Sequence, residues 1–128
     1  MGHFYVDCEI SHIRNPRKTV KALHLLVDTG SEYTWIAAET LKQISVKVQK
    51  KDVSFLMANG QTITRSLGYV ILRAEGFETV DEVVFGQPGD LQLLGSRTLE
   101  GFGAMVDARQ KRLVAAGPIP AARLMVQG

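Results

Sequence analysis

The chain has 128 residues, of which 45% are hydrophobic and 22% charged, and its formal net charge is +2. This length predicts one domain, residues 1–128, large enough to bury a core without disulfides or metals. The proportion of hydrophobic to charged residues excludes a disordered tail, and no apolar run reaches the ~20 residues that a membrane span needs. No signal peptide is visible either, so we expect a cytoplasmic protein with no membrane partner.

Side chains that commonly bind metals or nucleic acids are few and scattered. Cys8 is the single cysteine, so an internal disulfide is impossible, and its alternating surroundings predict a small buried residue. The three histidines have no ligand-like spacing. The densest basic group, residues 14–21, has no aromatic side chains for base stacking. We therefore expect no metal, no other cofactor and no nucleic-acid partner.

The first half of the chain has the pattern of strands. Apolar and alternating runs predict strands over residues 4–10, 20–27 and 33–36. Residues 37–44 have the apolar spacing of a short helix. Polar residues 47–52 are expected to lie exposed.

Asn59-Gly60 lies between two strand-like runs, residues 53–58 and 61–64. This dipeptide predicts a hairpin near 53–66 with a type I′ turn, which requires positive φ at both central residues. Further strands are predicted over 68–74 and 79–85.

The remaining segments are short. Residues 91–94 are apolar and end at a glycine, and Ser96 is placed to cap a helix over 96–100. Residues 104–107 and 112–116 form a last predicted hairpin. With no repeat or linker, the pattern predicts a small, closed, mainly antiparallel β-barrel with one or two short helices.

A carboxylate follows the second apolar strand directly, in Asp28-Thr29-Gly30-Ser31. A charge at the end of a buried strand is costly unless it is hydrogen-bonded. Gly30 permits a tight turn, the hydroxyl of Thr29 can bond to backbone, and that of Ser31 can bond the carboxylate. For these residues alone, a turn capped by Asp28 is the simpler interpretation.

Three further motifs follow Asp28 along the chain, and their order is as informative as their sequences. The hairpin tip is Ala58-Asn59-Gly60-Gln61, the apolar pair and glycine are Leu93-Leu94-Gly95, and Phe102-Gly103 precedes a strand ending at Asp107. Together with Asp28-Thr29-Gly30, they resemble the retropepsin-like aspartic proteases over roughly residues 4–117. Ser96 stands where many retroviral enzymes have a dimer-bracing arginine, and Ala58-Asn59-Gly60 replaces their glycine-rich flap tip. Both differences indicate a nearer likeness to the cellular and bacterial single-domain group.

The resemblance implies an acid-protease fold, a catalytic Asp28, and an active-site turn supported by Leu93-Leu94-Gly95. It implies that the hairpin is a flap over a peptide or protein substrate. Because one motif supplies one carboxylate, it also implies a homodimer with Asp28 from each protomer activating a water. The termini, Gly2 to Val6 and Leu124 to Val126, are expected to add to the interface. The alternative for Leu124 to Val126 is that this segment packs within its own chain or is disordered.

Other interpretations remain. The chain could be an inactive dimerisation or peptide-binding domain that kept the fold. Glu32 is either an exposed loop residue or a contact that influences substrate charge preference. Tyr33 and Trp35 are expected in the core or in a pocket wall. A serine hydrolase is disfavoured because no Gly-x-Ser-x-Gly segment exists.

Overall fold

The computed structural model describes residues 3–118 and 120, and within them the chain is mainly β. Nine strands and two short helices follow one another along the described residues. They are β1 (Tyr5–His12), β2 (Thr19–Val27), β3 (Thr34–Ala37), α1 (Ala38–Gln43), β4 (Lys50–Leu56), β5 (Thr62–Ala74), β6 (Phe77–Gly86), β7 (Leu93–Leu94), α2 (Ser96–Phe102), β8 (Ala104–Asp107) and β9 (Arg112–Ala115).

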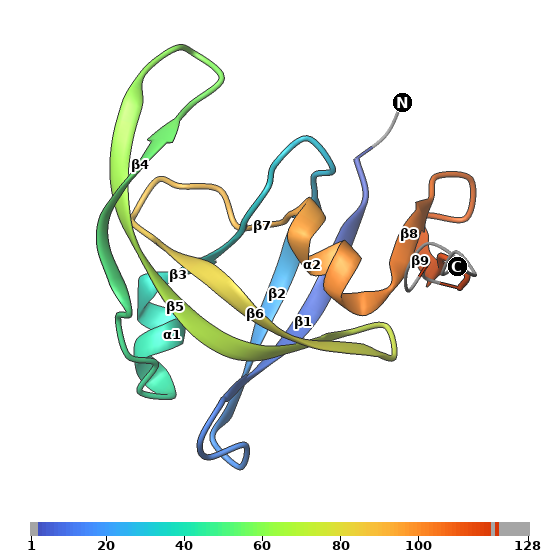
Figure 1. Ribbon diagram of the computed structural model, residues 1–128, viewed down its shortest axis with the longest axis horizontal. Coiled ribbons are helices and arrows are strands. Elements are labelled where there is room, and N and C mark those ends of the chain that lie inside the picture. Colours follow the sequence, from blue (N-terminus) through green and yellow to red (C-terminus); the bar gives the residue numbers. More distant parts are fainter. Residues whose placement is uncertain (1–2, 119, 121–128) are drawn as a thin grey trace, which may run out of the picture.

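Seven strands form one sheet in the order β1-β2-β7-β3-β6-β5-β4, and β8 pairs with β9 separately. The first strand also pairs with β5, so six strands make a ring of pairings and β4 stands outside it. Figure 1 shows the consequence: the hairpin of β4 and β5 rises beyond the body of the domain. The loop that follows β2 lies at the same end of the molecule.

The mainly β prediction is confirmed, but strand direction is more mixed than expected. The pairings β2–β7 and β3–β6 are parallel, whereas the others are antiparallel. The β2–β7 pairing arises because the connection between Gly86 and Leu93 brings Leu93–Leu94 into the sheet between β2 and β3. A two-residue strand carries no signal of its direction, so the sequence could not show this.

Three local predictions need correction. The runs 61–64 and 68–74 are one continuous 13-residue strand, β5, which passes from the hairpin into the ring. The strand β4 begins at Lys50, although its first three residues are exposed as expected. The helix α2 is capped by Gly95 in extended conformation, and Ser96 is its first helical residue.

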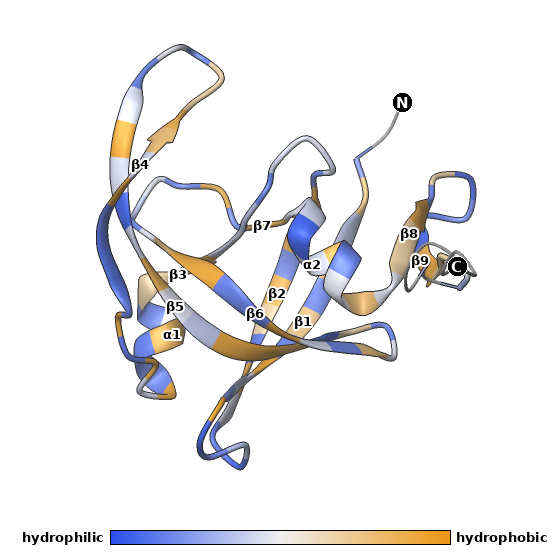
Figure 2. Ribbon diagram, in the orientation of Figure 1, coloured by the Kyte–Doolittle hydropathy of each residue, from blue (hydrophilic) through white to orange (hydrophobic). Residues whose placement is uncertain are grey.

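Alternate residues of the strands fill the interior, as Val6, Cys8 and Ile10 of β1 do. Figure 2 shows hydrophobic and hydrophilic residues interspersed along the strands. The main cluster includes Ile10, Leu25, Leu72 and Leu94, all 0% exposed. Cys8 is also buried, as its sequence context predicted. A smaller cluster of Trp35, with Leu67 and Val84, lies beneath the hairpin. The hairpin therefore has apolar support of its own.

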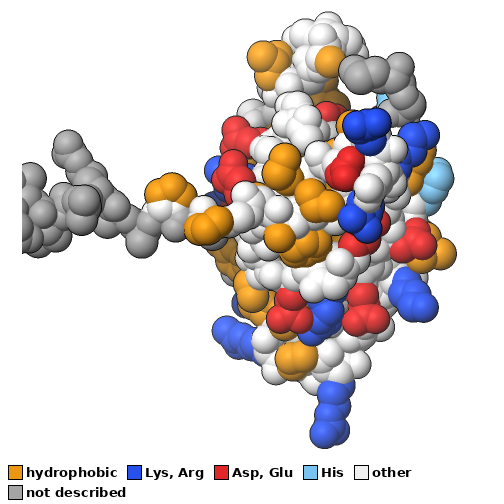
Figure 3. Space-filling model, turned by 90° about the vertical axis from the view of Figure 1, so that its right-hand side faces the viewer, with side chains coloured by type: hydrophobic (Ala, Val, Ile, Leu, Met, Phe, Trp, Pro, Cys, Tyr) orange, Lys and Arg blue, Asp and Glu red, His pale blue; other side chains and the backbone are white. Residues whose placement is uncertain are grey.

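On the face shown in Figure 3, acidic, basic and hydrophobic side chains are mixed, and no large patch carries charge of a single sign. Within the described residues, none of the helices is both long enough and apolar enough to span a bilayer. The predicted interface segment Leu124 to Val126 lies outside the described residues, as does Gly2.

Candidate active site

The turn after β2 holds the Asp28 carboxylate by backbone hydrogen bonds. The amide of Gly30 donates to Asp28 Oδ1 at 3.0 Å, and that of Ser31 donates to the Asp28 carbonyl at 3.1 Å. The Ser31 hydroxyl donates to the Tyr33 carbonyl instead of to the carboxylate, which corrects the sequence prediction. A short turn thus presents a half-buried carboxylate whose geometry is set by the main chain.

The predicted supporting segment lies directly against this turn. Leu93 and Leu94 pair in parallel with the end of β2, and the Leu94 carbonyl accepts the Asp28 amide at 2.9 Å. Two further amides, of Ser96 and Arg97, donate to the carbonyls of Ser31 (2.7 Å) and Glu32 (3.0 Å). These three hydrogen bonds fix the turn to β7 and to the start of α2.

Gly95 stands where this approach is tightest. A Cβ atom placed on it would collide with the backbone carbonyl oxygens of Glu32 and Tyr33. Such atoms cannot swing away as a flexible side chain could. The glycine of the Leu-Leu-Gly motif is therefore required by the contact between two backbones.

An open cleft of about 790 Å³ lies between the turn and the hairpin. Its walls come from the Asp28 turn, strand β4 and the loop before β7. They are formed by Asp28, Gly30, Ser31, Glu32, Tyr33, Trp35, Val53, Ser54, Phe55, Leu56, Met57, Ala58, Gly89, Asp90, Leu91 and Leu93. The carboxylate thus lies in a cleft large enough for a peptide segment.

Three aromatic rings form one wall of the cleft. The Phe55 ring packs edge-on against Tyr33 and Trp35, with centroid separations of 5.7 and 5.3 Å. Trp35 is 6% exposed, so it is both core and pocket wall, which is what the sequence predicted. The hairpin strand is held to the domain body through Phe55.

The hairpin tip is built differently from the prediction. Gly60 has φ of 85°, but Asn59 is not in the positive-φ region, so the turn is not type I′. The Gly60 amide donates to the Met57 carbonyl, and the Met57 amide donates to the Gln61 carbonyl. This pattern is typical of a three-residue loop ending in a left-handed glycine. Ala58 lines the cleft, whereas Asn59 to Gln61 form an exposed tip.

Comparison with known proteins identifies this arrangement. A model of the family described as aspartyl protease matches residues 15–98, a stretch that holds the Asp28 turn, the hairpin and Leu93-Leu94-Gly95. The chain belongs to the aspartyl protease family. The crystal structure of a retropepsin-like aspartic protease from Rickettsia conorii is similar, with a TM-score of 0.53 and 23% identity. The likeness covers 83% of this chain and 77% of that one, and it shows that the fold is retropepsin-like. No curated protein matches the sequence.

Two ion pairs beside the cleft of this aspartyl protease were missed by sequence reasoning. Arg97 contacts Glu32 at 3.2 Å and lies over the Tyr33 ring, 4.4 Å from its centroid. Arg65 of β5 makes a two-point contact with Asp90. The partner of Glu32 could have been found in the sequence. Arg97 directly follows Ser96 in the first turn of the predicted helix, close to the segment that supports the Asp28 turn.

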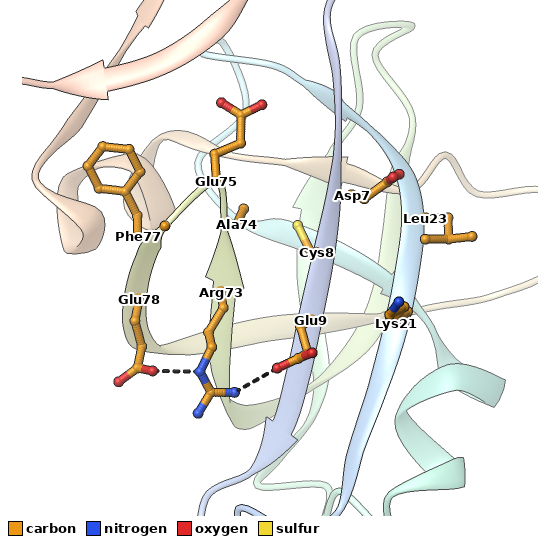
Figure 4. Close-up of a pocket in the computed structure, with 11 residues that line it drawn as sticks. Asp7, Cys8, Glu9, Lys21, Leu23, Arg73, Ala74, Glu75, Phe77 and Glu78 are labelled. Atoms are coloured by element: carbon orange, nitrogen blue, oxygen red, sulfur yellow. Dashed lines mark hydrogen bonds and ion pairs between the residues drawn. The ribbon is translucent and has the colours of Figure 1, made fainter.

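A second cavity, of about 410 Å³, lies between β1 and the hairpin of β5 and β6 (Figure 4). Three of its charged side chains are paired, since Arg73 contacts Glu78 at 2.6 Å and Glu9 at 3.5 Å. Burial, with smaller contributions from two nearby carboxylates, raises the pKa of Cys8 to about 12. The thiol is therefore protonated at neutral pH, which disfavours it as a nucleophile.

Proposed function

We propose that this protein is an aspartic endopeptidase in which Asp28 of each of two protomers forms one catalytic pair. The observation that carries the proposal concerns the carboxylates of the cleft. The Asp28 carboxylate accepts the amide of Gly30 in its own turn, whereas Glu32 and Asp90 each bind an arginine. A carboxylate neutralised by an arginine is a poor partner for sharing a proton, so the second acid has to come from another chain.

Exposure of the turn supports this assembly. Thr29 and Gly30 are exposed in the single chain, although they follow a strand that is part of the core. A two-fold axis beside this turn would bring two copies of it together in an isologous interface. The Thr29 hydroxyl is then available to bond to the partner's backbone. The homodimer therefore completes the site instead of merely accompanying it.

The pair of carboxylates accounts for the reaction. Two such groups a few ångströms apart share one proton, as in other aspartic proteases. The ionised member takes a proton from a water, and the resulting nucleophile adds to the scissile carbonyl carbon. The protonated member donates to the carbonyl oxygen. The carboxyl that took the water's proton then gives it to the leaving nitrogen as the C–N bond breaks, and the other carboxylate takes a proton back from a hydroxyl of the intermediate, so no acyl-enzyme forms.

The shape of the cleft favours an extended peptide. Strand β4 and the tip at Ala58 to Gln61 form a flap whose backbone can bond a substrate as an added strand. The wall of Tyr33, Trp35 and Phe55 presents aromatic surface, which favours apolar substrate side chains. Closure of the flap would exclude water from the reacting bond.

The test is hydrolysis of a peptide library by the purified wild-type protein and by Asp28→Asn at mildly acidic pH. The wild type is expected to cleave peptides next to apolar residues, and Asp28→Asn to lose at least a thousandfold in kcat/KM while keeping its thermal midpoint. Binding of peptides without hydrolysis by the wild type would instead favour a peptide-binding domain. Equal hydrolysis by both proteins would refute the assignment of Asp28.

A further inference from the structure

A chain of buried hydroxyl groups runs from the active-site support to a carboxylate that the mechanism above does not use. The Gly95 amide donates to Thr34 Oγ1 at 3.0 Å, and Thr34 Oγ1 lies 2.5 Å from Thr98 Oγ1. The Thr98 hydroxyl donates to Asp81 Oδ2, also at 2.5 Å. Thr34 and Thr98 are both 0% exposed. Four residues from β3, β6, α2 and the Leu-Leu-Gly motif are thus linked in series.

The protons in this chain have only one arrangement while Asp81 is ionised. Both Asp81 oxygens act as acceptors, Oδ2 from Thr98 and Oδ1 from the Glu82 amide at 2.8 Å. Thr98 has one hydroxyl proton and gives it to the carboxylate, so Thr34 must be the donor between the two threonines. Thr34 then offers its lone pairs to the Gly95 amide. Every donor therefore points toward Asp81.

Gly95 is the central residue of the segment that holds the catalytic turn. The residue before it accepts the Asp28 amide, and the residue after it donates to the Ser31 carbonyl. A shift of Gly95 would be transmitted to both of these bonds, because no side chain lies between the two backbones. The orientation of Asp28 is consequently sensitive to the bond that Thr34 makes with the Gly95 amide.

We propose that Asp81 is a positioning residue whose carboxylate, acting through Thr98 and Thr34, holds Gly95 and thereby the Asp28 turn in register. As a statement about catalysis, it rests on the proposed function. Protonation of Asp81 at Oδ2 would turn that oxygen from an acceptor into a donor, so the Thr98 hydroxyl would have to turn toward Thr34 and the Thr34 proton would need another acceptor. The device therefore depends on pH as well as on packing.

The surroundings of Asp81 agree with this sensitivity. Burial raises the pKa of Asp81 above its ordinary value, and the Thr98 and Glu82 hydrogen bonds oppose that rise. The charged groups that face it are Arg97 from α2, which favours the ionised form, and Glu82 on its own strand, which disfavours it. The neighbouring strands add no charge near Asp81: β3 provides the neutral hydroxyl of Thr34, and Val70 of β5 is the residue paired with Asp81.

The decisive experiment is an NMR pH titration of the full chain in an Asp28→Asn background, which removes the titration of the proposed catalytic group. The Gly95 amide resonance is expected to shift with an inflection that coincides with the titration of the Asp81 carboxyl carbon. Adding Asp81→Asn should abolish that inflection, whereas the matched change Asp107→Asn, in the β8–β9 hairpin, should leave it unchanged. An inflection that persists in Asp81→Asn, or is missing before that change, overturns the proposal. This readout needs no activity.

Kinetics then separates positioning from simple packing. Thr98→Val keeps the shape but removes the hydroxyl, and it should lower kcat about tenfold or more with KM changed less than about twofold. Thr98→Ser restores the hydroxyl and should stay within about twofold of wild-type kcat. Wild-type kcat in Thr98→Val would overturn the proposal. If the wild type cleaves no peptide, the proposed function fails, and the NMR titration still decides the inference.

Discussion

Arg65 and Asp90 join the β4–β5 hairpin, which contains the proposed flap, to the loop before β7 through two parallel hydrogen bonds. Arg65 Nε donates to Asp90 Oδ2 at 2.7 Å, and an Nη donates to Oδ1 at 2.8 Å. The Gln87 amide also donates to Oδ2, so the carboxylate closes its own loop while binding the flap strand. Both side chains are less than one-fifth exposed. This pair therefore tethers the base of the flap to one wall of the cleft.

Replacing Asp90 with Asn should cost stability in a pH-dependent manner. The hydrogen bond from Arg65 lowers the pKa of Asp90, opposed by burial. Because the pKa of Asp90 is lower in the folded state than in the unfolded state, its ionisation stabilises the fold fully at pH values above the unfolded-state pKa. That stabilisation is lost as the pH falls through the folded-state pKa. Between pH 7 and about pH 5, we expect the free energy of unfolding of Asp90→Asn to be about 1–2 kcal/mol lower than that of the wild type. Below about pH 4 the difference should shrink.

Urea unfolding of both proteins across this pH range measures the effect. A difference that grows as pH falls would contradict the tether as described. An aspartic protease that works at mildly acidic pH would keep this tether ionised throughout its working range.

Arg65→Lys should weaken substrate binding more than it weakens the fold. A lysine keeps the charge but cannot make the two-point contact with Asp90, so the flap base is held less firmly. We expect KM to rise about threefold to tenfold, with kcat changed less. The matched control is Arg73→Lys, since Arg73 makes its ion pairs with Glu78 and Glu9 outside the cleft. Equal kinetics in both variants would argue against a role for the Arg65 fork.

Phe55→Ala should loosen the flap at its aromatic support. The ring packs edge-on against Tyr33 and Trp35, and each such aromatic pair contributes about 0.5–1.5 kcal/mol beyond its buried area. We expect a rise in KM and faster exchange of β4 amides with solvent. Phe55→Leu retains apolar bulk and should lie between the wild type and Phe55→Ala. Unaltered β4 exchange in Phe55→Ala would show that the flap is held elsewhere.

Gly95→Ala should fail to fold or lose more than about 3 kcal/mol, because the added methyl group meets two backbone carbonyls. Gly76→Ala provides the comparison. Gly76 has φ of 86° with open space around it, so alanine there should cost only about 1 kcal/mol through backbone strain. Thermal unfolding of both variants checks the order, and a stable Gly95→Ala would contradict the close approach.

The sequence predicted those features whose signals are local. The strand ending at Asp28 and the closing hairpin of residues 104–107 with 112–115 were predicted within one or two residues, because apolar runs and turn residues mark them. The helix after Leu93-Leu94-Gly95 was also predicted, although its cap was shifted by one residue. The family signature supplied the expectation that this segment supports the turn, and the structure places it there.

The sequence did not predict the contacts between segments that are distant along the chain. The Arg65–Asp90 pair, the stacking of Arg97 on Tyr33, and the bond between Thr34 and Thr98 all join residues more than 20 positions apart. Each depends on how a loop or the helix α2 packs against the strands, which a hydrophobic pattern does not specify for polar side chains. The hairpin tip was mispredicted for a different reason, since Asn-Gly also suits a three-residue loop with a left-handed glycine.

The most direct test of the central claim, that two chains build one catalytic site, is sedimentation velocity with a parallel peptidase assay across a dilution series. Activity per protomer should fall in step with the dimer fraction, because dilution below the dimer dissociation constant removes the second Asp28. Asp28→Asn run beside it should dimerise without activity. A monomer that retains full specific activity would contradict the shared pair of carboxylates, and with it the proposed mechanism.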